Sequence, residues 1–436
     1  MGAEWEERSL GELIDIKHGF AFSGEHIHDE PRSDILLTPG NFAIGGGFKA
    51  DKFKYFDGDV PNDYVLSKGD LLVTMTDLSK QGDTLGYPAI LPNHTGRRYL
   101  HNQRIGKVIL KADDEVDERF LFYLLRSREY RHEILASATG TTVKHTSPRR
   151  ILAHKAKFPP LPEQKAIAAV LGALDDKIEL NRRMNATLEA MARALFQSWF
   201  VDFDPVRAKL DGRQPTGLDP TTAALFPNEF EDSELGPIPK GWRVGKLGEV
   251  ATNPRRTVRP NEIAPNTPYI ALEHMPRRSV ALSDWSDSAD VTSGKFSFRK
   301  GEILFGKLRP YFHKVGVAPL DGVCSTDILV IAPSTAEWFG FVLGHSSSTE
   351  LVNFTDLAST GTKMPRTNWS DIASFAVAVP PVELAAAFTH IIEPLIQLII
   401  GNSHASRTLA GMRDALLPKL LSGELRVGTQ EKLEVA

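Results

Sequence analysis

Several short stretches carry residue types that catalyse reactions or bind cofactors, and their spacing decides whether they can do so. An adenine methyltransferase needs an Asn or Asp ahead of Pro-Pro-Tyr/Phe. "FPPL" (158–161) has the two prolines without that leading residue, and it opens a helix. "GNFAIGGGF" (40–48) lacks the spacing and the strand-to-helix context of a nucleotide-binding fingerprint, so we expect a turn there. The sequence also contains no Gly-x-x-x-x-Gly-Lys-Ser/Thr loop.

Histidine and aspartate pairs suggest two further hypotheses, a metal site and a nuclease centre. His26 and His28 could form half of a metal site, but no clear partners are visible, so surface histidines are the preferred interpretation. Asp202 and Asp204 in "VDFDPV" could form a nuclease pair, but they directly follow a long helical pattern and fit a turn better. We therefore expect no catalytic residue, no metal site and no cofactor site on this chain.

Composition indicates a globular protein of two to four domains in a reducing compartment. The chain has 436 residues, a formal net charge of −4 and a single cysteine, Cys324, which excludes an internal disulfide. The acidic N-terminus does not resemble a signal peptide. The most apolar stretch, 388–400, contains Glu393 and Pro394 and is too short to span a bilayer. A cytoplasmic location is expected.

The positioning elements occur twice. "EWEERSLGELIDI" (4–16) recurs as "GWRVGKLGEVATN" (241–253), and "LSKGDLLVTM" (66–75) recurs as "FRKGEILFGK" (298–307). "ATGTTVKHT" (138–146) recurs as "STGTKMPRT" (359–367), and the Pro-Pro pair at 159 recurs at 380. Because the order of the matches is kept, the sequence predicts an internal two-fold duplication rather than a short-period solenoid.

Each half is predicted to be a mixed α/β domain followed by a long helix, which makes the fold class α+β. The predicted boundaries are 1–158 for the first domain, 159–202 for the first long helix, 203–240 for a Pro-, Gly- and Asp-rich connector, 241–379 for the second domain, 380–425 for the second long helix and 426–436 for a tail.

The proline clusters have a physical role as helix starts. Pro159 and Pro160 keep the entering chain extended, because a residue before proline avoids the α region. Pro162 can occupy the first helical turn, where its missing N–H costs nothing. Glu163 places a carboxylate at the positive end of the helix dipole. The second start, "PPVELAAAF", departs from "PPLPEQKAI" in this first turn.

Both long helices have apolar residues at alternating spacings of four and three, which predicts an antiparallel pair of coiled-coil helices. The predicted seam is formed by Ile167, Leu171, Leu174, Ile178, Asn181, Leu188 and Leu195 with Phe388, Leu395, Asn402, Leu409 and Leu416. Asn181 and Asn402 occupy equivalent positions, and we hypothesise that they meet at the centre of the seam and fix its register. Pro394 should kink the second helix or delay its regular part. A plain helical bundle core is the alternative interpretation.

Two similar domains on a shared helical rod suit the two-fold symmetry of the DNA backbone, and unlike domains would read unlike half-sites. The segment 158–206 strongly resembles the central repeat of the specificity subunits of type I restriction–modification enzymes. "KGEILFGKLRPYFHKVGVA" with "STDILVIAP" resembles the core of that family's target-recognition domains, and "DALLPKLLSGEL" (414–425) resembles its C-terminal end.

The resemblance implies a host-defence role in DNA modification. It implies that each target-recognition domain reads one half of a bipartite, asymmetric DNA target, and that the helices set the gap between the halves. It further implies docking of two modification (methyltransferase) subunits and of restriction and translocase subunits. S-adenosylmethionine, ATP and Mg²⁺ would then belong to those partners, and this chain would not be catalytic.

Candidate DNA contacts are basic, hydroxyl, amide and tyrosine side chains in the repeated glycine–threonine loops, in the matching segments "MTDLSK" and "KLRPYF", and in further basic stretches. Lys and Arg attract phosphates, while Arg and Gln can also read bases in the major groove. The candidates in the first half are Thr76, Ser79, Lys80, Arg97, Arg98, Gln103, Arg104, Thr141, Thr142, Lys144 and Arg149. Those in the second half are Arg255, Arg256, Lys307, Arg309, Tyr311, Thr362, Lys363 and Arg366. An ordinary solvated surface charge is the alternative interpretation of each.

Two other functions are open at this point. The chain could serve a complex that only methylates, which the sequence cannot separate from a complex that also cleaves. It could also be a structural adaptor that holds two protein-binding heads on a coiled-coil rod. A stand-alone methylase is disfavoured because the cofactor and catalytic motifs are missing.

Overall fold

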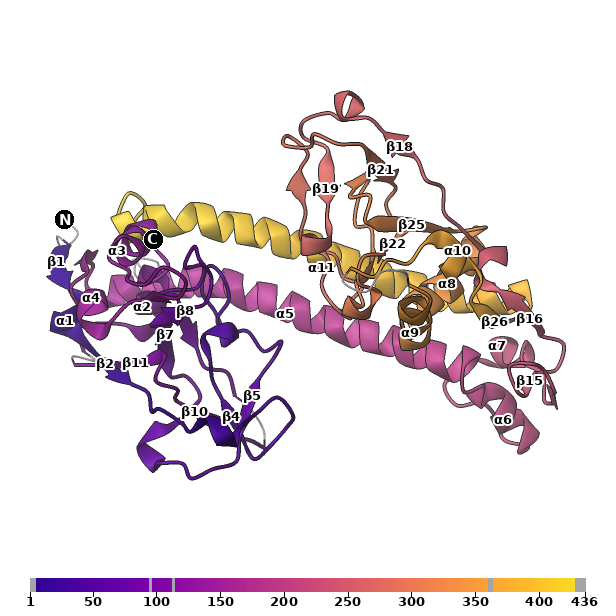
Figure 1. The fold of residues 1–436 in the computed structure, drawn as a ribbon, viewed down its shortest axis with the longest axis horizontal. Helices are drawn as coiled ribbons and strands as arrows, with labels where there is room; N and C mark the ends of the chain where they lie inside the picture. Colours follow the sequence, from indigo (N-terminus) through magenta and orange to yellow (C-terminus); the bar gives the residue numbers. More distant parts are fainter. Residues whose placement is uncertain (1–4, 94–95, 112–113, 360–363, 428–436) are drawn as a thin grey trace, which may run out of the picture. The chain divides into compact units, whose positions relative to one another are not determined.

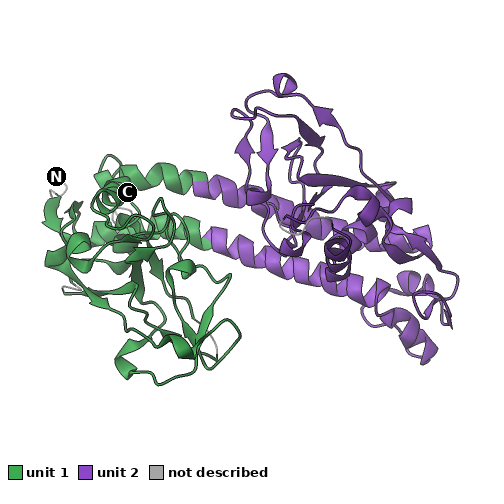
Figure 2. Ribbon diagram, viewed as in Figure 1, with its two compact units in different colours: residues 1–176, 411–436 green, residues 177–410 purple. Residues whose placement is uncertain are grey.

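The chain folds into two compact α+β units. The computed structural model describes residues 5–93, 96–111, 114–359 and 364–427. Unit 1 comprises residues 1–176 and 411–436, and unit 2 comprises residues 177–410 (Figure 2). The division crosses both long helices, α5 (Leu161–Phe200) and α11 (Val382–Ser422), so each unit contains a part of each helix (Figure 1).

Unit 1 is built on two sheets and four short helices. The four-stranded antiparallel sheet has the order β2 (Ile14–His18), β11 (Ile105–Leu110), β7 (Leu71–Thr74), β9 (Pro88–Ile90). The five-stranded sheet has the order β3 (Ile27–His28), β5 (Lys54–Phe56), β4 (Asp34–Leu36), β10 (Tyr99–Leu100), β6 (Val65–Leu66). Two strand pairs are β1 (Glu6–Ser9) with β13 (Lys155–Phe158), and β8 (Thr76–Asp77) with β12 (Lys144–His145). The helices are α1 (Leu10–Leu13), α2 (Glu118–Leu124), α3 (Arg128–Ala136) and α4 (Pro148–Leu152).

Unit 2 repeats this plan. Its four-stranded sheet has the order β17 (Ala251–Thr252), β25 (Ile328–Pro333), β22 (Ile303–Gly306), β23 (Val315–Val317). Its five-stranded sheet has the order β18 (Thr257–Val258), β21 (Lys295–Phe298), β24 (Gly322–Cys324), β19 (Pro268–Ile270), β20 (Ser286–Asp287). The pair equivalent to β1 and β13 is β16 (Arg243–Lys246) with β26 (Ala376–Val379). The helices α8 (Phe339–Ser346), α9 (Thr349–Ala358) and α10 (Trp369–Ala373) follow the order of α2, α3 and α4.

The two five-stranded sheets share a four-stranded core. The order β5–β4–β10–β6 in unit 1 corresponds to β20–β19–β24–β21 in unit 2, and each core contains one parallel pair, β4 with β10 or β19 with β24. The fifth strand differs, because β3 adds beside β5 whereas β18 adds beside β21. The sequence duplication is therefore a duplication of fold, as the α+β prediction with two similar domains required.

The segment 203–240 is folded rather than merely connecting. It contains α6 (Asp204–Leu210), α7 (Pro220–Ala224) and the hairpin of β14 (Phe230–Glu231) with β15 (Ile238–Pro239). Phe203, Val206 and Phe226 are buried in the main core of unit 2. Apolar side chains spaced through a Pro-rich segment thus anchor it to that unit.

The first turn of α5 attaches the helix to unit 1 through polar contacts. Glu163 accepts a hydrogen bond from the Trp5 indole Nε1 at 3.2 Å and pairs with Arg426 at 2.7 Å. The Gln164 amide donates to the carbonyl oxygens of Pro159 and Glu115, while its own oxygen accepts from the backbone N–H of Asp117. "PEQ" is therefore a docking motif as well as a helix start.

The second helix start replaces this polar contact with apolar packing. At the 221-residue offset of the repeat, Leu384 stands in the place of Glu163, and Leu384 is fully buried. Trp242, the counterpart of Trp5, is 4% exposed, and its Nε1 has no hydrogen-bond partner among the described residues. The loss of one carboxylate thus leaves one buried donor unsatisfied, at a cost of ~1–3 kcal/mol.

Pro394 does not delay the second helix. α11 begins at Val382 and continues as helix through Pro394 to Ser422, so the expectation of a late start was wrong. Pro394 is exposed. α11 is also the one described helix that is long and apolar enough to cross a membrane by length and composition. Its apolar residues Phe388, Ile392 and Ile396 are instead buried in the core of unit 2.

In unit 2, α5 and α11 run antiparallel, and two hydrogen bonds between side chains join them, beside a longer one of 3.5 Å from the Asn185 amide to the Ile399 carbonyl oxygen. The amide of Asn181 donates to the Ser406 hydroxyl at 3.2 Å, and the amide of Asn402 donates to the Asn185 side-chain oxygen at 2.9 Å. The repeat offset maps Asn181 onto Asn402 and Ser406 onto Asn185, so the two hydrogen bonds are copies of each other.

The predicted meeting of Asn181 with Asn402 was therefore wrong. In an antiparallel pair of repeated helices, equivalent residues face each other only at the local two-fold point, and the observed register places that point near Arg183 and His404. Asn181 and Asn402 lie two residues away from it, so each contacts a residue one helical turn beyond its copy.

The buried face of each helix is wider than a coiled-coil seam. In unit 2, Asn181 and Phe388 are buried, whereas the predicted seam residues Ile178, Leu188, Leu195, Leu395, Asn402 and Leu409 are half-buried. In unit 1, Ile167 and Leu171 are buried, and Leu174 and Leu416 are half-buried. Residues outside the heptads, such as Phe196 and Ile400, are buried because the helices also pack against the sheets and short helices of their unit.

The two units hold α5 and α11 against the shorter helices of each unit by different contacts. In unit 1, Asp175 of α5 accepts hydrogen bonds from Tyr123 (2.9 Å), Arg126 (3.0 Å) and Arg413 of α11 (2.7 Å). Burial alone would raise the pKa of Asp175, but the two guanidinium groups and the Tyr123 hydroxyl outweigh it and hold that pKa below its usual range.

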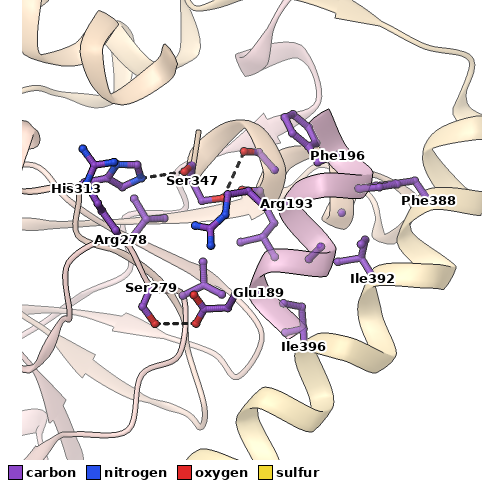
Figure 3. Close-up of a pocket in the computed structure, with 16 residues that line it drawn as sticks. Glu189, Arg193, Phe196, Arg278, Ser279, His313, Ser347, Phe388, Ile392 and Ile396 are labelled. Carbon is purple, nitrogen blue, oxygen red and sulfur yellow. Dashed lines mark hydrogen bonds between the residues drawn. The ribbon is translucent and has the colours of Figure 1, made fainter. Parts of the chain in front are cut away.

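In unit 2, the same four places are occupied by Ile396, Gly344, Ser347 and Ala192, and an apolar pocket lies there (Figure 3). A Cβ on Gly344 would lie 2.0 Å from the Phe196 ring, so the ring fills part of the space that Tyr123 occupies in unit 1. The charged cluster of one unit is thus an apolar contact in the other.

The Asn185–Asn402 pair yields a prediction about register. Asn402→Leu should lower the unfolding free energy by about 1–3 kcal/mol, because Asn185, which is 8% exposed, loses its amide donor. Asn185→Leu combined with Asn402→Leu should recover most of that loss, since no buried amide is left unpaired. Urea unfolding of the two single variants and the double variant measures the coupling. Additive single effects would show that the pair does not act as a unit.

Candidate nucleic-acid interface

In unit 1, the predicted contacts from two distant stretches come together at the pairing of β8 with β12. Thr76 and Asp77 pair in antiparallel register with His145 and Lys144, and the Thr76 hydroxyl contacts His145 Nδ1 at 3.2 Å. The glycine–threonine loop that contains Thr141 and Thr142 is closed by reciprocal backbone hydrogen bonds between Thr139 and His145. Thr141 and Thr142 are exposed.

The second loop of this surface, residues 78–84, is shaped by the buried Asp77. Its carboxylate accepts hydrogen bonds from the backbone N–H of Ser79 (2.6 Å), the hydroxyl of Thr84 (2.7 Å) and the backbone N–H of Thr84. Burial alone would raise the pKa of Asp77, and these hydrogen bonds outweigh burial and lower it. A single ionised group therefore closes the loop that carries the exposed Lys80.

Sequence reasoning missed Leu78 and the structural contacts of Arg131 on this surface. Leu78 is 65% exposed at the start of the loop, next to Ser79 and Lys80. Arg131 of α3 stacks 3.8 Å from the centre of the Tyr87 ring and donates to the Gly82 carbonyl oxygen at 3.0 Å. The residue pattern of "MTDLSKQGD" did not indicate that Asp77 anchors the loop, because its hydrogen-bond partner Thr84 lies outside this segment.

Unit 2 builds its counterpart from the segments 307–313 and 364–367. Leu308 forms an antiparallel bridge with Arg366, and the backbone N–H groups of Arg309 and Thr367 bond to the carbonyl oxygens of Pro365 and Lys307. The predicted contacts Lys307, Arg309 and Arg366 thus lie together. Thr362 and Lys363 lie outside the described residues.

The loop 307–313 of unit 2 is more strained than its counterpart. Arg309 and His313 have φ angles of 52° and 51°, in the left-handed region that L-residues rarely adopt. Tyr311 between them is 48% exposed. His313 donates from Nε2 to the Ser347 carbonyl oxygen at 2.9 Å, and burial lowers its pKa, so the ring is neutral.

The remaining candidates differ in whether their side chains are paired with a buried carboxylate or are simply exposed. Arg98 forms two hydrogen bonds with the buried Asp34, and Arg256 forms two with the buried Glu302. These pairs favour structural roles for both arginines. The other candidates, Arg97, Gln103, Arg104, Arg149 and Arg255, are exposed.

The residues that suggested other chemistry do not assemble a site in the described part of the chain. His26 and His28 both contact Asp57, at 3.3 and 3.0 Å, on the edge of the five-stranded sheet. No group of three or more His, Cys, Asp or Glu side chains with the geometry of a metal site occurs among the described residues. Asp202 accepts a hydrogen bond from Gln197, and Asp204 begins the short helix α6.

The comparisons with known proteins agree with this architecture. Residues 2–190 match the family model described as type I restriction modification DNA specificity domain. The chain is 27% identical to the type I restriction enzyme MjaIX specificity subunit of Methanocaldococcus jannaschii, over 88% of this chain and 91% of that protein. It is also 27% identical to the HindI specificity subunit of Haemophilus influenzae, over 97% and 100% of the two chains.

A solved structure is similar in fold. The crystal structure of the type I restriction–modification S subunit from M. genitalium matches with a TM-score of 0.57 and 17% sequence identity, over 96% of each chain.

The Asp77 anchor predicts a pH-dependent contribution to stability. Asp77→Ala should lower the unfolding free energy by about 1–3 kcal/mol at neutral pH, because the carboxylate hydrogen bonds to Ser79 and Thr84 are lost. The folded-state pKa lies below the unfolded value of about 3.9, so the difference from wild type should be full above about pH 5. It should disappear as pH falls through the folded-state pKa. Thermal unfolding from pH 7 to pH 3 tests this, and a constant difference would contradict the assignment.

Proposed function

Because the chain belongs to the specificity subunits of type I restriction–modification systems, we propose that it reads a bipartite, asymmetric DNA target. Unit 1 reads one half-site through the β8–β12 surface, and unit 2 reads the other through the segments 307–313 and 364–367. The observation that carries this proposal is the duplication: two units of one topology each present a polar loop surface at the same place, with different side chains. The domain boundaries 1–158 and 241–379 are part of the proposal.

The long helices set the gap between the half-sites. α5 spans 40 residues and α11 spans 41, each without a break. A helix rises about 1.5 Å per residue, so each is about 60 Å long. Half-sites one DNA turn apart are separated by about 34–36 Å. A continuous helix transmits its length without the slack of a loop, which suits a fixed gap.

The outer faces of these helices dock the partner subunits. On α5 in unit 2, Leu180, Met184 and Met191 are 49%, 39% and 49% exposed, and with Thr187 and Ala194 they form a second stripe at heptad spacing. On α11, the exposed Leu398, Gly401, Ala405 and Thr408 follow the same spacing. An exposed apolar stripe of this period fits a partner helix. The modification (methyltransferase) subunits and the restriction subunit are the proposed partners.

The chain itself does no covalent chemistry in this proposal. The partner subunits bind S-adenosylmethionine, ATP and Mg²⁺, and the complex works in the cytoplasm on double-stranded DNA. The same sites serve a complex that only methylates.

The direct test is to map methylated adenines. The chain would be expressed with the modification subunit of its own system in a host that lacks adenine methylation, and the genome read by methylation-sensitive long-read sequencing. We expect one motif with two unlike blocks and a fixed gap. A complex that assembles, leaves the genome unmethylated and fails to shift random duplex DNA would instead favour the structural adaptor with two protein-binding heads.

Lys144 provides a second prediction, about phosphate contact. Lys144→Ala should weaken binding of the complex to target and scrambled duplexes alike and reduce the steepness of the salt dependence by about one contact, since lysine acts on phosphates without reading bases. Fluorescence anisotropy at several salt concentrations measures both. Lys68→Ala, an exposed lysine in another turn of unit 1, is the control. A changed methylation motif would show that Lys144 reads bases instead.

A further inference from the structure

One arginine of unit 2 adopts a backbone conformation for which unit 1 uses glycine. The short 3₁₀ turn 39–41 of unit 1 corresponds to the turn 272–274 of unit 2, since each follows the parallel strand, β4 or β19, and closes with the same hydrogen bonds. When these two turns are aligned, Arg278 matches Gly45. Gly45 has φ 87° and Arg278 has φ 57°, so both are left-handed.

Glycine adopts this conformation freely, whereas a residue with a Cβ pays a conformational cost. The retention of a strained non-glycine residue points to a use for its side chain. This match could not be predicted, because "MPRRS" shares no residue pattern with the unit 1 segment "FAIGG" that would align the two turns.

The turn that carries Arg278 is fixed to the loop of the candidate interface. The backbone N–H of Arg278 donates to the His313 carbonyl oxygen at 2.8 Å. The neighbouring Arg277 stacks 4.0 Å from the centre of the Phe312 ring, and Arg309 lies 5.8 Å from the same ring. Figure 3 shows Arg278 and His313 next to each other among the residues that line the pocket. Two separate segments thus place Arg277 and Arg309 at one aromatic ring, and Arg278 follows Arg277 in the chain.

The three arginines of this cluster, Arg277, Arg278 and Arg309, have no ion-pair partner in the part of the chain that the structure describes. Arg98 and Arg256, in contrast, each pair with a buried carboxylate. Arg277 and Arg278 are exposed, and Arg309 Nε is a buried donor without a described partner. Exposed Tyr311 lies in the same loop. A cluster of guanidinium groups with free donors next to exposed aromatic surface attracts phosphate oxygens, which accept two parallel hydrogen bonds from one guanidinium.

We infer that Arg277 and Arg278 are phosphate-contacting residues that extend the unit 2 interface and hold the DNA backbone of the half-site read by that unit. This inference rests on the proposed function. The two arginines position the duplex, and the segments 307–313 and 364–367 read it. Since phosphate contacts carry no sequence information, the two residues govern affinity and its salt dependence but leave the target sequence unchanged.

The test exploits the unit 1 residue at the strained position. Arg278→Gly removes the guanidinium and relieves the backbone, so the assembled complex should unfold at the same temperature as wild type or a higher one. Its affinity for a duplex that carries the mapped motif and its affinity for a scrambled duplex should each fall about tenfold. The slope of log affinity against log salt concentration should become shallower by about one released ion. Arg213→Gly, an exposed arginine in the 203–240 segment, should change neither affinity.

The outcomes separate this inference from the proposed function. If the wild-type complex binds its motif and Arg278→Gly binds equally well, the phosphate assignment is overturned while the DNA-reading role stands. A changed methylation motif in Arg278→Gly would also overturn it, since that residue would then read bases. Arg277→Ala is the second variant, at an exposed position outside the left-handed region, and the same loss of affinity is expected there. A wild-type complex that binds no DNA would fail the proposed function itself.

Discussion

The register of α5 against α11 in unit 2 is the constraint on which the rest depends. Two buried amide contacts, Asn181 with Ser406 and Asn402 with Asn185, are copies related by the repeat offset. A shift of one helical turn would leave buried amides unpaired, whereas apolar seam residues alone would tolerate such a slip. These polar pairs give two helices of one polypeptide the arrangement of a symmetric dimer of helices. Along the chain, α5 follows the strands of unit 1 and α11 follows those of unit 2.

The two heads use one framework for different surfaces. In unit 1 an ionised aspartate, Asp77, draws its loop into shape through the backbone of Ser79 and Thr84. In unit 2 the corresponding loop contains two residues in the left-handed conformation, Arg309 and His313. Arg277 packs against the Phe312 ring of this loop. The framework thus fixes where each of these loops emerges, and the loop chemistry is free to vary. That division suits the proposed role in DNA recognition, because a new target needs new loops but no new fold.

Much of the fold could be predicted from the sequence, because duplication and helix starts leave local signals. Pro162 and Glu163 stand in the first turn of α5, as predicted, whereas the pairing of the Thr76 and Lys144 segments came from the structure alone. The asparagine register could not be predicted, since it depends on where the local two-fold point falls. Arg277 and Arg278 were missed because only the backbone reveals the left-handed turn. The unpaired N–H donor of Trp242 could be explained only by comparing the two helix starts, where Leu384 takes the place of Glu163.

At one place the contact of the long helices with their unit is ionic in unit 1, through Asp175, Arg126 and Arg413, and apolar in unit 2, where Ile396 and Gly344 take the equivalent positions. The same place in the two halves therefore answers differently to substitution. Loss of the Asp175 carboxylate would leave the buried Arg126 side chain without its ion-pair partner, whereas truncation of Ile396 would only enlarge an apolar cavity.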